Sequence, residues 1–555
     1  MEGTAADSHL RLVPLGGLGE FGLNAMVLEW GDRLLLVDAG VMFAGADLPG
    51  VDSIVPDFQY LADRRDKVDG IVLTHGHEDH IGALSVALQA APAPVYGSRL
   101  TLGFAERRLR DRNIEADLRP ITPGQPVEVG PFRLHPIRVA HSVLDSLALA
   151  IETPAGVVLA SGDFKIDPQA RPEERTDVEA LAEWGRRGVL ALLSDSTNVE
   201  TRGQTPGEDT VIPALREVFT RTRGRVLVTC FATSIPRIQR VSDLAVEAGR
   251  NIALIGRRMN DNAEVAMDLG LLRVPRGYFV APAGATDAAP ASLAMLVSGS
   301  QGEPLSALSL ISVGEHRDVA VGPGDTVVFS SRVIPGNERA VSRVISNLYR
   351  RGCDVVQPSS AHVHVSGHGS QEDLVELLKL TKPKYLIPIH GEYRMLAQHA
   401  RLAAQAGLTA DQVHVLEDGD VLAFRPEGAQ REGRVGAGRI LLDRSGATEI
   451  EEVVLRDRRH LSHEGVVVPI VVLDKQTGRL EGEPEIVTRG FVDDAEQADL
   501  LADATRLLIE AVDARPVAEL ADPSLLRERV RAELRRFFRK RTQRRPMVIP
   551  VVMEV

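Results

Sequence analysis

The sequence predicts a multidomain α/β protein, and three observations along the chain lead to this prediction. Short apolar segments separated by Gly, Pro and Asp turns fill residues 10–200, a texture typical of strands. From about 205 to 350, apolar strands alternate with helical patterns, as they do in βαβ units with a parallel sheet. Beyond about 450, further strand segments and two helical runs predict a small α/β part.

Strands are expected to dominate the first part. Each candidate is a short apolar or alternating run that ends in a turn residue. In chain order they are LRLVPL at 10–15, LNAMVLEW at 23–30, RLLLVDAG at 33–40, IVLTH at 71–75, FRLHPIRVAH at 132–141, SLALAIE at 146–152, GVVLASGD at 156–163 and VLALLSD at 189–195.

The middle block has a different pattern and is predicted to be an insertion. The strands RVLVTCF at 225–231 and NIALIG at 251–256 flank a helical stretch, IPRIQRVSDLAVEAG at 235–249. After this block, KYLIPIHGEYRML at 384–396 and HVLEDGDVLAF at 414–424 return to strands and loops. Because the pattern of the first part resumes after the middle block, we predict that this block interrupts a single domain.

The end of the chain is predicted to form a separate domain. A polar, Gly-rich stretch, EGAQREGRVGAGR at 427–439, precedes the strand segments VVVPIVVLD, EPEIVTRGF and MVIPVVMEV. The expected division has an interrupted domain, an insertion, a linker and a C-terminal domain. These are residues 1–204 and 351–430 for the interrupted domain, 205–350 for the insertion, 431–450 for the linker and 451–555 for the C-terminal α/β domain.

Composition indicates an ordinary folded protein of a reducing compartment. The 555 residues are 44% hydrophobic and 25% charged, which is far from the composition of disordered chains. The two cysteines, Cys230 and Cys353, form neither a disulfide framework nor a zinc module. Because no signal-peptide pattern and no run of 18 or more apolar residues is found, we expect a cytoplasmic protein without a membrane span.

Net charge argues only weakly against a polyanionic partner. The chain carries −13, but the stretch from Arg527 to Arg545 holds ten Arg or Lys and two Glu, a local +8. The apolar residues of this stretch recur at helical spacing, and the helix is expected to begin at Asp522 and Pro523. A helix packed on a core with a solvated basic face is the simpler interpretation, and contact with an RNA backbone is the other.

The strongest chemical signal is the segment THGHEDH at residues 74–80, which follows the apolar strand Ile71–Leu73. Three imidazoles and a carboxylate within six residues are too many for one metal ion but suit two. Packing so many titratable groups in one loop would cost stability through desolvation and repulsion unless a cation compensates. The segment therefore predicts a metal site.

Three isolated candidates also stand at strand ends: His141, Asp163 and His390. Taken singly, a strand-end His or Asp is usually a satisfied turn residue. That interpretation is kept for His135, His316 and His414.

Together with THGHEDHIGAL, those three candidates resemble the metallo-β-lactamase fold, an αββα sandwich whose loops hold a pair of metal ions. The resemblance covers about residues 10–430. Asp195 in LLSDSTN, His368 in HVHVSGHG and His390 in PIHGEYR, with the middle block, resemble the three extra motifs of the β-CASP nucleases. With GGLGEFGLN near the start, the whole chain is similar to the bacterial ribonuclease J family. The implied fold class is α/β, an αββα sandwich with an inserted β-CASP α/β domain and a small C-terminal α/β domain.

The resemblance implies two divalent metal ions per chain. Every ligand is an imidazole or a carboxylate, and one carboxylate is shared between the ions. The resemblance assigns His75, His77 and His141 to one ion, Asp79, His80 and His390 to the other, and Asp163 to both. Since these ligand types suit zinc and tolerate manganese, zinc is expected, with manganese as the alternative.

Catalytic and substrate-binding residues follow from the same resemblance. His368, positioned by Asp195, is similar to the family's general acid, and Asp79 counts as catalytic as well as ligating. Asp38 in LLLVDAG matches the first family motif and is expected to orient ligands without binding metal. The residues expected to cradle phosphate through side chains or backbone N–H groups are His364, Ser366 and Gly367.

Two further phosphate contacts, Ser234 and Arg258, are implied less specifically. Thr233 or Ser234 is also a plausible helix N-cap, with Pro236 in the first turn, and capping alone accounts for these residues. For Arg258 a surface salt bridge is an equally good explanation.

The segment Gly17–Gly22 satisfies G-x-G-x-x-G but is not expected to bind a dinucleotide. The fingerprint requires a helix after the glycines, whereas LNAMVLEW alternates like a strand. A hairpin is predicted instead.

The resemblance implies a ribonuclease that degrades RNA from a 5′-monophosphate end, also cuts internally, and acts in RNA maturation and decay. Single-stranded RNA is the expected partner, with a homodimer or homotetramer and assembly with other RNA-degrading proteins. The alternatives are a β-CASP nuclease acting on DNA and a catalytically inactive RNA-binding scaffold subunit. Hydrolysis of a β-lactam or a thioester is disfavoured, because the large insertion would have no purpose in it.

Overall fold

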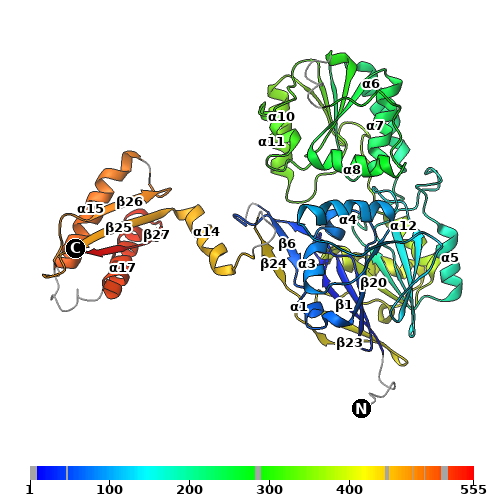
Figure 1. Ribbon diagram of the computed structural model, residues 1–555, viewed down its shortest axis with the longest axis horizontal. Coiled ribbons are helices and arrows are strands. Elements are labelled where there is room, and N and C mark those ends of the chain that lie inside the picture. Colours follow the sequence, from blue (N-terminus) through cyan, green and yellow to red (C-terminus); the bar gives the residue numbers. More distant parts are fainter. Residues whose placement is uncertain are drawn as a thin grey trace. The chain divides into compact units, whose positions relative to one another are not determined.

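The computed structural model describes residues 9–45, 48–281, 289–443, 449–477, 479–492, 494–513 and 523–555. The chain forms two compact units (Figure 1). The larger comprises Met1–Met42 and Ile54–Ile440, and the smaller comprises Phe43–Ser53 and Leu441–Val555. Among the described residues, no helix combines the length and the apolarity needed to cross a bilayer.

Two stacked sheets form the centre of the larger unit. The first has eight strands, in spatial order β23 (Gly428–Arg434), β22 (Asp420–Arg425), β1 (Leu10–Gly16), β3 (Ala25–Trp30), β4 (Arg33–Val37), β7 (Val68–Val72), β8 (Val95–Gly97) and β9 (Leu118–Pro120). The second has six, in the order β10 (Val127–Val129), β11 (Phe132–Arg138), β12 (Leu147–Thr153), β13 (Gly156–Ala160), β14 (Ala191–Asp195) and β20 (Tyr385–Ile389).

Apolar side chains of both sheets meet in one core. Leu12 and Leu28 of the first sheet and Leu149 and Leu193 of the second belong to the same buried cluster. This burial follows from strands that are apolar at nearly every position, as LLLV in β4 and LALAI in β12. The core holds the strand ends that carry the site in fixed positions.

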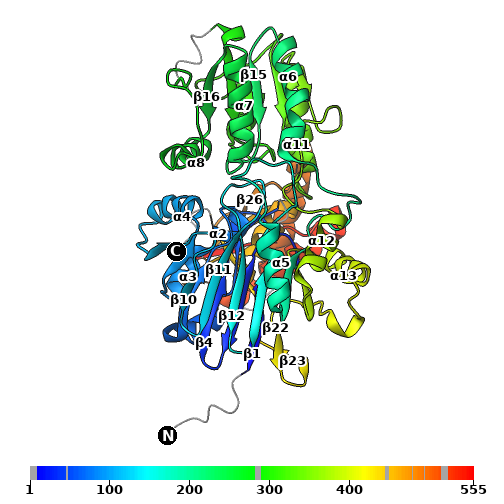
Figure 2. The same ribbon diagram turned by 90° about the vertical axis from the view of Figure 1, so that its right-hand side faces the viewer.

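Helices cover the outer faces, so the layers are αββα (Figure 2). On the face of the second sheet, Leu181 and Trp184 of α5 and Leu377 of α12 pack in one cluster. The helices of this face are α5 (Val178–Arg187), α12 (Gln371–Thr381) and α13 (Tyr393–Leu402). Those that follow strands of the first sheet or lie near it are α1 (Gln59–Ala62), α2 (Glu78–Ile81), α3 (Leu84–Ala90) and α4 (Arg99–Asp111).

A five-stranded parallel sheet forms the middle block. Its spatial order is β16 (Asn251–Ile255), β17 (Leu293–Val297), β15 (Val226–Thr229), β18 (Thr326–Phe329) and β19 (Asp354–Val356). The connecting helices are α6 (Ile212–Arg221), α7 (Ile235–Glu247), α8 (Arg257–Asp268), α10 (Ala307–Val313) and α11 (Glu338–Arg350). The chain leaves the sandwich after β14 and returns to it with α12 and then β20, which pairs with β14 in parallel.

The smaller unit has one sheet and three helices among the described residues. Its sheet contains β26 (Glu485–Arg489), β25 (Val466–Leu473), β27 (Met547–Val548) and β28 (Val551–Glu554). The helices are α14 (Glu452–Glu464), α15 (Asp494–Asp513) and α17 (Pro523–Thr542). Along α17, the side chains that join the core are Leu526, Val530, Leu534 and Phe538.

The remaining elements are short. The strands are β2 (Leu18–Gly19), β5 (Met42–Phe43), β6 (Ser53–Pro56), β21 (Gly391–Glu392) and β24 (Arg439–Leu442). The single 3₁₀ turns are η2 (Arg65–Lys67), η3 (Glu208–Val211), η4 (Pro290–Ser292), η5 (Ala403–Ala406) and η6 (Ala410–Gln412).

The fold class expected from the sequence is confirmed, and several local expectations need correction. Helices α4 and α5 lie in the part where strands were predicted to dominate, and neither was predicted; both have an N-cap side chain, Ser98 and Asp177, that accepts a backbone N–H. GEYRML was predicted as strand and loop, but helix α13 begins at Tyr393. The polar stretch predicted as a boundary contains β23, which pairs with β22. The proposed start of α17 at Asp522 lies outside the described residues.

A strand follows the G-x-G-x-x-G segment, as predicted. β1 and β3 pair antiparallel, and their connection contains the short strand β2. Gly17 and Gly22 have φ of 94° and 92°, a region that favours glycine. A Cβ at Gly17 would lie 2.6 Å from Oδ1 of Asn24, so the loop also needs glycine for space.

Candidate metal centre

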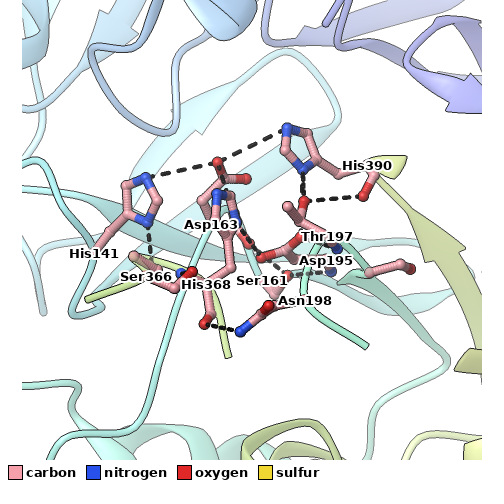
Figure 3. A network of polar contacts seen from close by, with 12 residues as sticks. His141, Ser161, Asp163, Asp195, Thr197, Asn198, Ser366, His368 and His390 are labelled. Carbon is pink, nitrogen blue, oxygen red and sulfur yellow. Dashed lines mark hydrogen bonds and ion pairs between the residues drawn. The ribbon is translucent and has the colours of Figure 1, made fainter. Parts of the chain in front are cut away.

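Six histidines and several carboxylates meet where strands of both sheets end. Figure 3 shows His141, His368 and His390 of this cluster around Asp163. The loop after β7 carries His75 and His77, and the short helix α2 that follows carries Asp79 and His80. The second sheet adds Asp163 after β13, Asp195 at the end of β14 and His390 after β20. Residues Asp195 and Ile389 lie opposite each other in the parallel β14–β20 pair, which explains why the carboxylate of Asp195 lies beside His390.

Oδ2 of Asp163 lies at the centre of the cluster. It is buried and makes no hydrogen bond within the described part of the chain. Five ring nitrogens surround it, at 3.4 Å for His75 and His80, 3.7 Å for His141, 3.8 Å for His368 and 3.9 Å for His390. A buried carboxylate oxygen with so many imidazoles beyond hydrogen-bond distance is well placed to share a cation with them.

One side of the cluster is a set of three converging imidazoles. Nδ1 of His77 lies 3.1 Å from Nε2 of His75 and 3.1 Å from Nε2 of His141. Tetrahedral zinc with bonds of about 2.0–2.1 Å to nitrogen places its donor atoms about 3.3 Å apart. The spacing of these nitrogens therefore fits one tetrahedral ion, with Asp163 as the fourth ligand.

The other side combines Asp79, His80 and His390. Nε2 of His390 is 3.2 Å from Oδ2 of Asp79, and Nε2 of His80 is 3.8 Å from the same oxygen. Their candidate ligand atoms lie within 4.8 Å of one another. Three candidate ligand atoms this close to one another, beside Asp163, could hold a second ion.

Hydrogen bonds orient the rings so that one nitrogen of each faces the cluster. Nδ1 of His80 donates to Asp38 at 2.8 Å, and Nδ1 of His141 donates to the carbonyl oxygen of Gly367 at 2.9 Å. Thr74 donates its hydroxyl to Asp38 and lies 3.1 Å from Nδ1 of His75. Outer partners of this kind fix the tautomer of metal-binding histidines.

Electrostatics differ between the two sides of the cluster. Burial lowers the pKa of His75 and His141 well below the ordinary value and that of His77 to about 4, so these rings are neutral at pH 7. Neutral imidazoles are the form that binds metal. For His390, burial is outweighed by Asp163, Asp195 and Asp79, which raise its pKa to about 10.

The carboxylates of the cluster remain ionised. Burial alone would raise the pKa of Asp163 and Asp79, but the surrounding imidazoles outweigh it and hold both pKa values below the usual range. The raised pKa of His390 and the lowered pKa values of the carboxylates show that positive charge is stabilised on this side. A metal cation supplies such charge.

His368 and Asp195 form a second, adjoining pair. Nδ1 of His368 donates to Oδ2 of Asp195 at 2.8 Å, and the ring stacks on His390 with centroids 5.5 Å apart. Burial lowers the pKa of His368, but Asp195 and Asp163 outweigh it and raise the pKa above its ordinary value. A protonated imidazole held in this way can donate a proton.

The candidate phosphate cradle lies on the segment that leads to His368. Gly367 is close to His141, and a Cβ there would lie 2.7 Å from Cε1 of that ring. The backbone N–H of His368 donates to Oγ of Ser366 at 3.1 Å. Burial lowers the pKa of His364 to about 3, and its Nδ1 has no hydrogen-bond partner in the described chain.

Ser234 and Arg258 lie at the carboxyl end of the inserted sheet. Ser234 is the N-cap residue of α7 and is buried, but its side chain makes no capping hydrogen bond. Phe231, three residues earlier, has its ring 6.3 Å from that of His77, so this loop reaches the cluster. Arg258 forms an ion pair with Asp111 at 3.3 Å, as the salt-bridge interpretation expects.

The sequence predicted no role for four further residues that contact the site. They are Asn24, Thr74, Lys165 and Thr197. Nδ2 of Asn24 lies 3.0 Å from the carbonyl oxygen of Asp79 and 3.1 Å from Nε2 of His80. Lys165 is buried and donates to the carbonyl oxygens of Pro206 and Ser366, each at 3.1 Å. Only their position in the sequence could have indicated such a role, because each of these residues lies within or beside a segment that carries site residues.

Comparison with protein families gives matches along most of the chain. Residues 18–201 match the metallo-β-lactamase superfamily, and 223–348 match the β-CASP domain of ribonuclease J. Residues 356–416 match the Zn-dependent metallo-hydrolase RNA specificity domain. Residues 453–555 match the ribonuclease J C-terminal domain.

Curated relatives are similar over nearly the full chain. Ribonuclease J2 of Bacillus subtilis is 37% identical over 549 residues, which is 99% of each protein. Ribonuclease J of Mycobacterium tuberculosis is 38% identical and covers 100% of this chain and 99% of its own. Ribonuclease J of Synechocystis is 40% identical, over 87% of this chain and 76% of its own.

A solved structure shows the fold independently. A protein of unknown function from Enterococcus faecalis superposes with a TM-score of 0.53 at 14% identity. It covers 75% of this chain and 100% of its own.

Proposed function

Because the chain belongs to the ribonuclease J family and is a metal-dependent ribonuclease, we propose that it removes nucleotides from 5′-monophosphate ends of single-stranded RNA and also cuts internally. The position of Asp163 Oδ2 among five imidazole nitrogens supports this most directly. That arrangement suits two cations held by one shared carboxylate, and two such cations would stabilise the attacking and leaving oxygens of an in-line displacement at phosphorus.

The proposed ligands divide into two sets that share Asp163. One set is His75, His77, His141 and Asp163, and the other is Asp79, His80 and His390. Asp163 is assigned to the second set as well, because its Oδ2 lies 3.4 Å from His80 and 3.9 Å from His390. Zinc is expected from the imidazole and carboxylate donors, with manganese as the alternative. Two such ions supply Lewis acidity and a hydroxide nucleophile at neutral pH.

The proposed proton donor is His368. Departure of the 3′ oxygen from phosphorus requires a proton, and a ring hydrogen-bonded through Nδ1 to Asp195 keeps Nε2 for that transfer. The negative charge of Asp195 stabilises the imidazolium form. Asp79 takes part as a ligand beside the reacting phosphate.

The proposed phosphate contacts are His364, Ser366 and Gly367. They precede His368 directly, so a phosphate bound by them lies next to the proton donor. Because His364 is neutral, it contributes hydrogen bonds without charge. Ser234 and Arg258 are proposed as outer contacts from the inserted domain, and for Arg258 this requires exchange of its ion pair with Asp111.

The remaining proposals concern organisation. We retain residues 1–204 and 351–430 as the catalytic domain, 205–350 as the insertion, 431–450 as a linker and 451–555 as the C-terminal domain. We further propose a cytoplasmic homodimer or homotetramer that joins RNA-degrading assemblies. Both cysteines are free and buried, which accords with a reducing compartment.

A matched set of substrates tests the proposed activity. RNA and DNA of one sequence, each labelled near the 5′ end and carrying a 5′-monophosphate or a 5′-triphosphate, are incubated with the full chain and zinc or manganese. Labelled mononucleotide from monophosphate RNA is the expected product, with slower internal cleavage of triphosphate RNA. Cleavage of DNA alone would assign the site to a DNA nuclease, and RNA binding without cleavage would contradict the proposal.

A further inference from the structure

Asp195, the last residue of β14, and the two residues that follow it each contact a histidine, and Figure 3 shows the contacts of Asp195 and Thr197. Asp195 accepts from Nδ1 of His368 at 2.8 Å, and Ser196 has its hydroxyl 3.0 Å from Nδ1 of His399, a buried ring on α13. The hydroxyl of Thr197 contacts Nδ1 of His390. One short segment therefore holds the proposed proton donor, a core histidine and a proposed metal ligand.

The contacts of Thr197 define which ring nitrogen of His390 faces away from the cluster. The Thr197 hydroxyl lies 3.2 Å from the carbonyl oxygen of His390, which can only accept, so this hydroxyl donates to the carbonyl. Its oxygen then accepts from the N–H at Nδ1 of the same residue. Nε2 lies on the opposite side of the ring, and it faces Asp79 at 3.2 Å and Asp163 at 3.9 Å.

Backbone conformation adds a second reason for this contact. His390 has φ of 57°, in the left-handed region that non-glycine residues rarely occupy. Such a conformation persists only where surrounding contacts hold it. Thr197 contacts both the ring and the carbonyl of His390, and its own N–H donates to Oδ1 of Asp195 at 2.9 Å.

We propose that Thr197 is a positioning residue for one of the two metal ions, because its hydroxyl fixes the ring of His390 with Nε2 towards Asp79 and Asp163. The inference rests on the proposed two-ion site. Loss of this hydroxyl should weaken binding of one metal ion and leave the other unchanged. The contacts described for His75, His77 and His141, the imidazoles proposed for the other ion, do not include Thr197. Asp195 Oδ1, 3.3 Å from Nδ1 of His390, remains as a weaker acceptor when the hydroxyl is absent.

Stepwise zinc binding to the metal-free full chain tests the proposal. Thr197→Val replaces the hydroxyl by a methyl group of similar size, and we expect the affinity for one zinc ion to fall by about 10- to 100-fold while the other affinity is unchanged. Thr197→Ser restores the hydroxyl and should restore both affinities. Thr153→Val is the matched control, because its hydroxyl also makes two hydrogen bonds but lies in the β12–β13 turn.

The outcomes separate this inference from the proposed function. Two unchanged affinities in Thr197→Val would overturn the role of Thr197 and leave the two-ion site intact. An equal loss of both affinities with a lower melting temperature would also overturn it, because that is the result of a general structural defect. Failure of the wild-type chain to bind two zinc ions would instead contradict the proposed function.

Discussion

Asp163 illustrates how a single residue organises the site. Its carboxylate is 2% exposed, and its Oδ2 is closer than 4 Å to five imidazole nitrogens. A buried carboxylate costs several kcal/mol unless charge or hydrogen bonds compensate. Here positive charge compensates, and the same requirement explains why so many histidines converge on one oxygen.

Replacement of His368 separates proton donation from metal binding. In His368→Ala we expect RNA cleavage to slow by roughly 10²- to 10⁴-fold, because the leaving oxygen loses its proton donor. The metal content should remain that of the wild type, since His368 belongs to neither proposed ligand set. Cleavage rates and metal analysis on the same preparation check this, and loss of an ion from the variant would instead make His368 a ligand.

Glu20 is expected to make stability depend on pH. Burial raises its pKa to about 7, and the nearby Asp418 adds to this while Arg439 opposes it. The folded chain therefore binds more protons than the unfolded chain between about pH 4.5 and 7, so stability falls as pH rises through that window. Over the same pH range, the free energy of unfolding of Glu20→Gln should fall by roughly 1 to 3 kcal/mol less than that of the wild type.

Melting temperatures of the wild type and Glu20→Gln at about pH 5 and about pH 8 measure this difference. The melting temperature of the variant relative to that of the wild type should be higher at the higher pH. Identical pH profiles would show that the carboxyl group titrates normally in the folded chain. Glu432→Gln is a suitable control, because hydrogen bonds from Arg425, His9 and Arg11 outweigh burial and lower the pKa of Glu432 to about 2.

The sequence predicted the site residues by type and order, and it missed residues that act on them. The cluster at 74–80 was recognisable because repulsion among so many titratable groups has no structural benefit. Thr197 and Asn24 carry no such signal, since a lone Thr or Asn after a strand is usually a turn residue. Their contacts with His390 and His80 appear only once β14, β20 and the β1–β3 connection are placed together.

At the scale of elements, the parallel pair β14–β20 brings the two halves of the interrupted domain together. Its register places Asp195 and Ile389, the last residues of the two strands, side by side, although they lie 194 positions apart in the sequence. The strands were predictable from apolar runs, whereas the helices α4 and α5 were not recognised among them. Pairing across the insertion depends on packing that local patterns do not contain.

Arg237 connects the two segments that enter and leave the inserted domain. Its guanidinium donates to Glu208 at 2.6 Å and to the carbonyl oxygens of Val363 at 3.0 Å and Ser330 at 3.2 Å. Because both partners are buried, Arg237→Ala leaves the charge of Glu208 without its cation and should cost about 3 to 5 kcal/mol.

A double variant distinguishes a stranded charge from lost packing. Arg237→Met strands the charge of Glu208 but keeps an aliphatic side chain, and its combination with Glu208→Gln also removes that charge, so the double variant should recover part of the stability that Arg237→Met alone loses. Denaturant unfolding of the three proteins measures the difference. Equal losses in the single and double variants would show that packing, and not the unpaired carboxylate, dominates.

At the scale of the whole molecule, charge is distributed unevenly along the chain. The net charge is −13, yet the exposed face of α17 carries Arg535, Arg539 and Lys540. An acidic protein that binds RNA needs local basic surface, because phosphate contacts supply most of the sequence-independent affinity.

Neutralising that face tests whether it contacts RNA. Replacement of Arg535, Arg539 and Lys540 by Gln should weaken RNA binding and reduce the slope of log affinity against log salt by about 0.7 per lost phosphate contact. The matched control replaces three exposed arginines of the larger unit, Arg65, Arg350 and Arg401, by Gln. If both triple variants keep the wild-type slope, α17 serves only to pack the C-terminal core.

The most direct test of the account is the Asp163→Ala variant, assayed for bound metal and for RNA cleavage together. The wild type should hold about two ions per chain and release nucleotides from 5′-monophosphate RNA. In the variant, both ions should bind weakly and cleavage should fall to background, because the shared ligand is gone. Two tightly bound ions with normal cleavage in Asp163→Ala would contradict the account.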